Sequence, residues 1–267
     1  MEIQIKKAIK AGNSSAVILP RAWLNKEVRI ELVRKTPDVI LMDVIEILKK
    51  HISLKEVIGI YLAGSYARGE EDENSDIDIL IITDNIDREM IQEGAYNLLI
   101  VSYQLINQKL EQDLFPIGQM LKEAKPLINS DYIKDLEIKV TKKNVKWYLD
   151  STEEKLNLIK KYIDDAKNEK KKYISDAIAY SLVLRIRTLE IIKKLIQNKS
   201  YSKKEFLRLI KKISGSLVVY ERYLAVKNNL KEKSELKIDE AEKLYNYLKK
   251  DLEKVNEMIL KVSDKKK

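Results

Sequence analysis

The chain has no cysteine, one histidine, seven glycines and four prolines among its 267 residues. Without cysteine there is no disulfide framework, no zinc knuckle and no thiol chemistry. No run of apolar residues approaches the length of about eighteen that a transmembrane helix needs, so we expect no membrane partner. The first residues, MEIQIKKAIKAG, are mixed and charged and contain no apolar stretch typical of a signal peptide. We therefore expect a cytoplasmic protein.

Charge is distributed unevenly along the sequence, although the net charge is only +9. Residues 1–40 hold 8 basic and 4 acidic side chains, residues 41–140 hold 10 and 19, and residues 141–267 hold 33 and 19. An acidic middle segment therefore lies between two basic flanks. A basic flank is compatible with a nucleic acid, an acidic protein partner or a solvated helical surface, and composition alone does not distinguish these.

The most informative stretch is YLAGSYARGEEDENSDIDILIIT, residues 61–83. Asp76 and Asp78 flank an isoleucine, and because side chains alternate along a strand, both carboxylates should share one face. Two neighbouring carboxylates repel each other unless a cation lies between them, and Mg²⁺ suits such oxygen ligands. Gly64 lets the backbone approach a ligand closely, and free N–H groups near Ser65 are suited to a phosphate if a helix begins there. Together these features suit metal-dependent nucleotidyl transfer.

Gly64-Ser65, ten residues and then Asp76-x-Asp78 resembles the signature of the nucleotidyltransferase superfamily related to DNA polymerase β. The resemblance is greatest to its minimal members, which include antitoxin-type enzymes and the aminoglycoside nucleotidyltransferases. It implies that Asp76 and Asp78 are catalytic and bind two Mg²⁺ or Mn²⁺ ions. It also implies that ATP or another nucleoside triphosphate is the substrate. The residues implied to bind the nucleotide are Gly64, Ser65 and Arg68.

The family pattern also includes a third carboxylate on the next strand, where it activates the attacking group. The next apolar run here begins at Asn97, so an amide occupies the expected acidic position. Asparagine can offer an oxygen to a metal but cannot accept a proton at neutral pH. Asn97 is therefore a candidate metal ligand, and Glu93 is an alternative source of the missing acid. The departure leaves the expected fold unchanged and leaves activity open.

Residues 1–36 predict a small β module of their own. Gly12 to Ser15 forms a turn signal before a short apolar run, and Pro20 ends that run. The string AGNSSAVILPR resembles the AbrB/MazE family, whose members dimerise through interlocked hairpins and often bind DNA. The resemblance implies a homodimer. Dimerisation alone and DNA binding remain equally open, since phosphate contact needs little more than clustered positive charge. The candidate DNA-binding residues are Lys6, Lys7, Lys10 and Arg21.

Residues 37–140 form the expected nucleotidyltransferase core, and residues 141–267 predict helices throughout. Capping boxes are predicted at Ser151 and Ser202, and the segment 174–196 is apolar on most of its surface, as is typical of a central bundle helix. The bundle resembles the HEPN-like helical domain of the aminoglycoside nucleotidyltransferases. HEPN ribonucleases have an arginine followed by a histidine, and no histidine occurs in this segment. That pattern excludes a ribonuclease of this kind.

The sequence thus predicts an α+β protein: a small β N-terminal module, a polymerase-β-like core with a short mixed sheet, and a C-terminal helical bundle. The predicted function is Mg²⁺-dependent transfer of a nucleoside monophosphate, AMP from ATP, to a hydroxyl of a protein or small-molecule acceptor that the sequence does not identify. The alternative is a non-catalytic, nucleotide-sensing DNA-binding regulator or antitoxin-like protein, which the basic N-terminal module and Asn97 favour.

Overall fold

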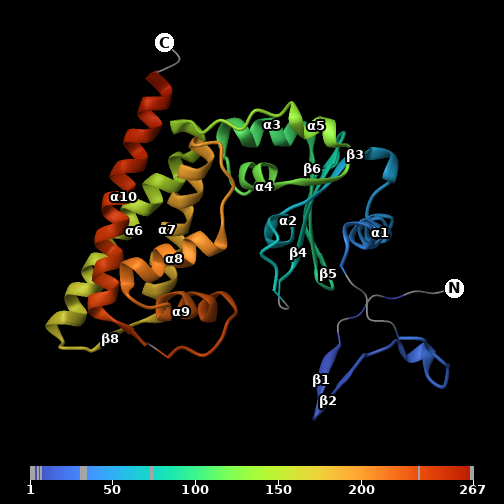
Figure 1. Cartoon of the computed structure of the whole chain (residues 1–267), viewed down its shortest axis with the longest axis horizontal. Coiled ribbons are helices and arrows are strands. Elements are labelled where there is room, and N and C mark those ends of the chain that lie inside the picture. Colours follow the sequence, from blue (N-terminus) through green and yellow to red (C-terminus); the bar gives the residue numbers. More distant parts are fainter. Residues whose placement is uncertain are drawn as a thin grey trace. The chain divides into compact units, whose positions relative to one another are not determined.

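Figure 1 shows the computed structural model of the chain, which describes residues 4, 6, 8–30, 35–72, 75–233 and 235–264. The chain divides into two compact units. The sheet unit comprises Met1–Leu105 and Ala124–Asp135, and the helical unit comprises Ile106–Glu123 and Leu136–Lys267. A mixed sheet and a set of helices confirm the expected α+β class. Residues 106–123 and 136–140, which we expected within the nucleotidyltransferase core, group with the helices in this division.

The sheet unit is built on five strands in the spatial order β5-β6-β4-β3-β7. Strands β4 and β6 are parallel, whereas the β3–β4, β3–β7 and β5–β6 pairs are antiparallel, so the sheet is mixed as expected. The strands are β3 (Val57–Leu62), β4 (Ile77–Thr83), β5 (Arg88–Glu93), β6 (Tyr96–Ser102) and β7 (Lys125–Ile128). The central strand β4 is buried on both faces over residues 79–83, which explains its nearly continuous apolar sequence.

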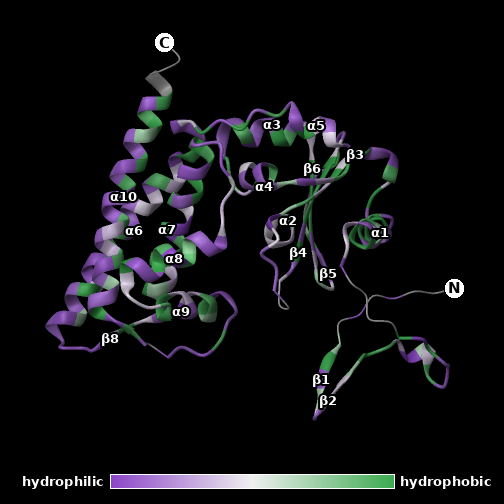
Figure 2. Ribbon diagram, in the orientation of Figure 1, coloured by the Kyte–Doolittle hydropathy of each residue, from purple (hydrophilic) through white to green (hydrophobic). Residues whose placement is uncertain are grey.

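Helix α1 (Pro37–Leu48) covers one face of this sheet. Thr36 caps it by accepting a hydrogen bond from the Val39 N–H, and Pro37 occupies its first turn, where proline is well tolerated. Its buried apolar side chains pack against the strand residues that alternate onto the same face, and Figure 2 shows the apolar character of these strands. The core residues include Ile40, Val44, Ile47, Leu48, Ile60, Ile77, Ile79, Tyr96, Leu98 and Ile100.

A polar cluster fixes the entrance to α1 against β6. The Lys35 ammonium donates hydrogen bonds to the Asp43 carboxylate at 2.7 Å and to the Tyr96 hydroxyl at 2.9 Å. The Tyr96 hydroxyl also donates to Asp43. Because burial and this carboxylate both disfavour the phenolate, the pKa of Tyr96 is raised well above its usual value. Lys35 therefore anchors the start of α1 to the core of the sheet unit.

The sheet unit also contains shorter elements. These are η2 (Leu54–Glu56), α2 (Gly64–Arg68), α5 (Ser130–Lys134) and the first residues of α3 (Tyr103–Gln112). Strand β7 is tied to β3 by the Tyr61 hydroxyl, which donates to the Asn129 carbonyl at 2.7 Å. Burial raises the pKa of Tyr61 to about 12, so this hydroxyl keeps its proton and continues to donate.

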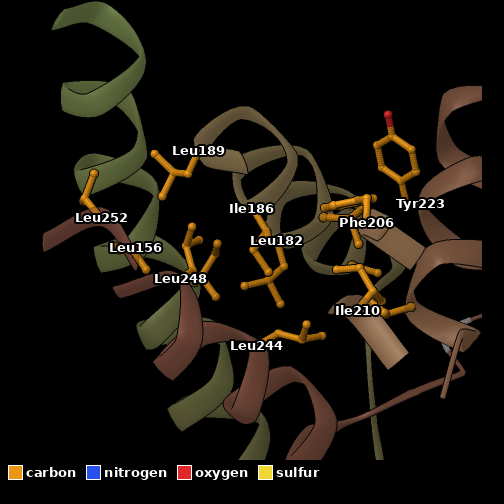
Figure 3. Packing of buried hydrophobic residues seen from close by; sticks show 14 of the residues in the cluster. Leu156, Leu182, Ile186, Leu189, Phe206, Ile210, Tyr223, Leu244, Leu248 and Leu252 are labelled. Carbon is orange, nitrogen blue, oxygen red and sulfur yellow. The ribbon is translucent and has the colours of Figure 1, made fainter. Parts of the chain in front are cut away.

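The helical unit is organised around α7 (Asp176–Ile196), as the expected central helix over residues 174–196 predicts. Its apolar side chains Leu182, Ile186 and Leu189 contribute to a core shared with neighbouring helices (Figure 3). Ser202 caps α8 as expected, by accepting a hydrogen bond from the Glu205 N–H. The other elements are α4 (Ile117–Glu123), α6 (Lys142–Asn168), β8 (Tyr173–Ile174), α8 (Lys203–Ser214), α9 (Val218–Lys227), β9 (Leu236–Lys237) and α10 (Ile238–Asp264).

The expected capping box at Ser151 is wrong, because α6 begins earlier. Thr141 is the actual N-cap and forms a capping box with Asn144. The Asn144 amide also donates to the backbone carbonyls of Leu110 and Lys139 at 2.6 and 2.8 Å. These contacts join segments distant in sequence and fix the helix start. Ser151 instead lies within the helix and accepts a hydrogen bond from Arg185 at 2.7 Å.

The N-terminal segment contains the expected hairpin. Strands β1 (Ile9–Ala11) and β2 (Ser14–Ala16) pair around Gly12, whose positive φ of 61° suits the tight turn. Strand β2 includes only the first residue, Ala16, of the apolar run over residues 16–19. A single helical turn, η1 (Arg21–Trp23), follows Pro20. No helix among the described residues is long and apolar enough to cross a membrane.

Candidate functional site

The site begins at the junction of β3 and α2, where Gly64 meets Asp78. The Ala63 N–H donates to the Asp78 carbonyl at 2.8 Å, which holds the start of α2 against β4. Gly64 has a φ of +65°, and a β-carbon added there would lie only 2.1 Å from the Asp78 carboxylate oxygen Oδ2. The carboxylate therefore occupies the space that any other side chain would need. This close approach explains why a glycine stands at this position.

Asp76 and Asp78 alternate with the fully buried Ile77 at the start of β4. Ile77 packs in the core beneath α1, so strand alternation directs both aspartates away from that core. Asp76 is exposed and Asp78 is half-buried. The two carboxylates are thus available to a ligand at one end of the sheet.

Asn97 lies on β6 directly beside Asp78. The two residues are register partners in the parallel β4–β6 pair, and the Asn97 amide nitrogen Nδ2 donates to the Asp78 oxygen Oδ1 at 3.3 Å. Asn97 is thus the neighbour of Asp78 on β6, at the position where the resemblance to polymerase-β-like enzymes led us to expect a carboxylate. In this geometry Asn97 supports the Asp78 carboxylate through a neutral donor and adds no negative charge.

Glu93 does not serve as the alternative third acid. It is the register partner of Tyr96, so its side chain lies on the α1 face of the sheet, opposite to Asn97. Its carboxylate forms an ion pair with Lys50. The register partner of Asn97 is Gln92, which the sequence reasoning missed because strand β5 was not expected. Gly94, at a φ of +62° just before the apolar run that begins at Tyr96, was the available hairpin signal.

Ser65 and Arg68 lie on α2 next to Gly64. Ser65 is half-buried, and its carbonyl accepts a hydrogen bond from the Glu70 N–H at 2.9 Å. The Arg68 guanidinium donates through Nε to the Glu70 carboxylate at 2.9 Å, and both side chains are largely buried. Arg68 is therefore held close to the start of the loop between α2 and β4, and a nucleotide that contacts it would share it with Glu70.

The surroundings of α2 are acidic. The pKa of Tyr66 is raised by burial and then by the negative charges of Glu71 and Asp72. These carboxylates lie in the same loop that leads to Asp76 and Asp78. A negative potential of this kind favours a cation and disfavours a bare triphosphate.

The donor set suits a magnesium ion that is shared with a nucleotide. Among the described residues, no three acidic, histidine or cysteine side chains gather closely enough to enclose a metal ion. Mg²⁺ commonly binds one or two carboxylates and completes its coordination with phosphate oxygens and water. Asp76 and Asp78, with the acidic loop beside them, match that requirement. An ion here is therefore expected to bind together with a nucleotide.

The candidate DNA-binding residues lie apart in sequence from these groups, on the N-terminal segment. Lys10 is on β1, Arg21 is on η1, and both are exposed, as is Lys6. Lys7 lies outside the described residues. The hairpin brings Lys10 opposite Ser15, and no acidic side chain lies on either of its strands.

Comparison with protein families gives a match to the nucleotidyltransferase domain over residues 41–262. The chain therefore belongs to the nucleotidyltransferase domain family, whose general reaction is transfer of a nucleotide to an acceptor. The match covers the sheet site and most of the helices and leaves residues 1–40 outside. Comparison with curated protein sequences gives no match.

Two solved structures show distant similarity. One is the spectinomycin adenyltransferase AAD(9) from Enterococcus faecialis, crystallised with ATP and spectinomycin, with 19% identity and a TM-score of 0.43 over 80% of this chain and 98% of that chain. The other is a nucleotidyltransferase-like protein from Exiguobacterium sibiricum, with 14% identity and a TM-score of 0.31 over 83% and 77% of the two chains. Neither similarity defines a substrate for this chain.

Proposed function

We propose that the protein is a Mg²⁺-dependent nucleotidyltransferase that moves AMP from ATP to a hydroxyl of a protein or small-molecule acceptor. The observation that carries the proposal is the Asp78 carboxylate packed against Gly64 at the start of α2, with Asp76 two residues earlier, immediately before β4. This arrangement offers metal ligands and nearby backbone N–H groups to one triphosphate. Membership of the nucleotidyltransferase domain family supports the reaction class.

Each residue has a distinct part in this proposal. Asp76 and Asp78 would hold two Mg²⁺ or Mn²⁺ ions, which when bound neutralise charge on the phosphates and stabilise the attacking and leaving oxygens. Gly64 and Ser65 would bind the phosphates through the first N–H groups of α2. Arg68, held by Glu70, would contribute positive charge at the same end of the sheet.

The acceptor hydroxyl must lose a proton, and Asn97 cannot receive it. Replacing Asn97 with aspartate restores a proton acceptor beside Asp78, and we expect transferase activity to rise on the order of 10-fold or more. The new carboxylate also repels Asp78 in the absence of metal. Mg²⁺ should therefore raise the melting temperature of N97D more than that of the natural protein. Asn97→Ser is the control, since it removes the amide without adding charge. Unchanged activity and an unchanged response to Mg²⁺ would show that Asn97 is not at the metal site.

The N-terminal hairpin is proposed as a dimerisation module. None of the described residues from 8 to 30 is buried, and three large apolar side chains, Ile18, Leu24 and Ile30, are 69%, 72% and 71% exposed. A short segment that leaves such side chains in water is stabilised when a second copy covers them. Interlocked AbrB-like hairpins would provide that cover. DNA contact through Lys6, Lys7, Lys10 and Arg21 is the second role proposed for this module.

Removal of residues 1–34 should convert a dimer to a monomer. The deletion keeps Lys35, which binds Asp43 and Tyr96, and Thr36, which caps α1, so the core keeps its polar anchor. Light scattering coupled to gel filtration measures the molar mass directly. An unchanged mass after deletion contradicts the dimerisation role. If the hairpin also binds DNA, affinity for duplex DNA should be lost in the same variant and should fall steeply with salt in the natural protein.

The enzymatic proposal is tested with ATP labelled at either the α- or the γ-phosphate, incubated with protein, Mg²⁺ and fractions of a cell lysate. Nucleotidyl transfer places the α-label on an acceptor and releases the γ-label in pyrophosphate. A labelled polypeptide or small molecule then identifies the acceptor class. Transfer of the γ-label alone would show a phosphotransferase. ATP binding without transfer of either label would favour the alternative, a nucleotide-sensing regulator.

A further inference from the structure

Helix α8 differs in charge from the other long helices of the helical unit. Its twelve residues, KKEFLRLIKKIS, contain five basic side chains and one acidic side chain. On α6, by contrast, lysines pair with aspartates one turn away, as in Lys146–Asp150 and Lys160–Asp164. Such mixed pairs are typical of a solvated helical surface. The charge of α8 is not balanced in this way.

The basic residues of α8 are concentrated on its outer face. Phe206 and Ile210 are buried and point into the shared core (Figure 3). The exposed basic residues follow the helical repeat on the other side, at positions 204, 208, 211 and 212. Because α8 rises about 1.5 Å per residue, this stripe is about 10–12 Å long. We call Arg208, Lys211 and Lys212, with Lys199 just before the helix, the α8 basic face.

The one acidic side chain of α8 is already neutralised. Glu205 forms an ion pair with Lys194, and the pKa of Glu205 is lowered first by this hydrogen bond and charge and further by Lys199 and Arg208. In the part of the chain that the structure describes, Arg208, Lys211 and Lys212 have no carboxylate within ion-pair distance. Their charges are therefore available to an external anion.

We propose that the α8 basic face binds the phosphate backbone of a single-stranded nucleic acid. Its chemistry fits a polyanion better than a protein surface, because α8 has no exposed large apolar residue among those described, whereas protein interfaces bury apolar and aromatic side chains at their centre. Nucleic-acid interfaces are polar and strongly cationic. The stripe is only one helix wide, and a flexible single strand can follow it.

The test measures binding of a fluorescein-labelled 20-nucleotide RNA to the full-length protein by anisotropy at several salt concentrations. We expect R208Q/K211Q/K212Q to weaken binding at least about tenfold and to reduce the slope of log K against log salt by about 2, as three lost phosphate contacts require. The matched control K143Q/K155Q/K161Q removes three exposed basic charges from α6 and should change affinity less than about twofold. K6Q/K10Q/R21Q reports any contribution of the N-terminal hairpin. All the substituted residues are exposed, so circular dichroism should show unchanged melting.

Several results would overturn the proposal. They are absence of RNA binding, equal losses in the α8 and α6 variants, and loss only in the hairpin variant. Tighter binding of duplex than of single-stranded oligonucleotide would also contradict it. If polyglutamate displaced the labelled RNA as effectively as unlabelled RNA of equal total charge, the α8 basic face would be a site for acidic proteins instead. Repeating the titration with single-stranded DNA shows whether the sugar matters. Equal affinity for DNA and RNA supports recognition of the phosphates alone.

Discussion

Replacing Asp76 and Asp78 together with asparagine is expected to weaken Mg²⁺-dependent ATP binding at least about 100-fold, which corresponds to about 2.7 kcal/mol. Asparagine keeps the shape of each side chain but removes two negative charges from the proposed metal ligands. The strand should still form, since Ile77 and the apolar residues that follow it are untouched. Titration calorimetry with ATP, in the presence and absence of Mg²⁺, measures the difference directly.

Asp84→Asn is the matched control for this experiment. Asp84 is an exposed aspartate just beyond the other end of β4, so its replacement removes a charge from the same strand region without touching the site. It should leave Mg²⁺-dependent binding unchanged. Equal affinity of the natural protein and the double variant would remove Asp76 and Asp78 from the site.

Gly64→Ala should be much more harmful than Gly69→Ala, although both glycines have similar backbone conformations. Their φ values are +65° and +67°, so an added side chain is strained in both cases, by about 1–2 kcal/mol. At Gly69 nothing lies within 4 Å of the new β-carbon, whereas at Gly64 the Asp78 carboxylate lies 2.1 Å away. Gly69→Ala should reduce stability only by the cost of the strained backbone conformation. Gly64→Ala must also displace Asp78 or α2.

Urea unfolding and Mn²⁺ titration together separate these effects. Gly69→Ala should lower the free energy of unfolding modestly and keep metal binding in the presence of ATP. Gly64→Ala should lower the free energy of unfolding by at least about 1 kcal/mol more and weaken metal binding. Equal destabilisation and equal metal affinity in both variants would show that the contact between Gly64 and Asp78 has no role in the site.

The local parts of the site could be predicted from sequence because they depend on short-range periodicity. Alternation around Ile77 places Asp76 and Asp78 together without any knowledge of neighbouring strands. The position of Asn97 beside Asp78 requires only one further assumption, that the next apolar strand along the chain pairs with the Asp78 strand in parallel. The role of Gly64 required the structure, because its reason is a side chain that lies fourteen residues later in the chain.

Register and long-range contacts explain what sequence reasoning missed. Glu93 is close to Asn97 in sequence, but the hairpin at Gly94 turns it to the opposite face of the sheet. A shift of one residue in the β5–β6 register would move the Glu93 side chain from the face where it pairs with Lys50 to the face of the candidate metal ligands. A local pattern also failed at Ser151, where a continuous buried stripe through Val145 and Leu149 extends the helix and overrides the apparent cap.

The central claim is that Asp76 and Asp78 jointly hold divalent metal against a nucleotide. A crystal of the protein grown with Mn²⁺ and a non-hydrolysable ATP analogue tests it most directly, since Mn²⁺ is identified by its anomalous scattering. We expect an anomalous peak within about 2.2 Å of oxygens from both carboxylates and in contact with phosphate oxygens. A bound nucleotide with no metal at Asp76 and Asp78, or with its metal held elsewhere, would contradict the account.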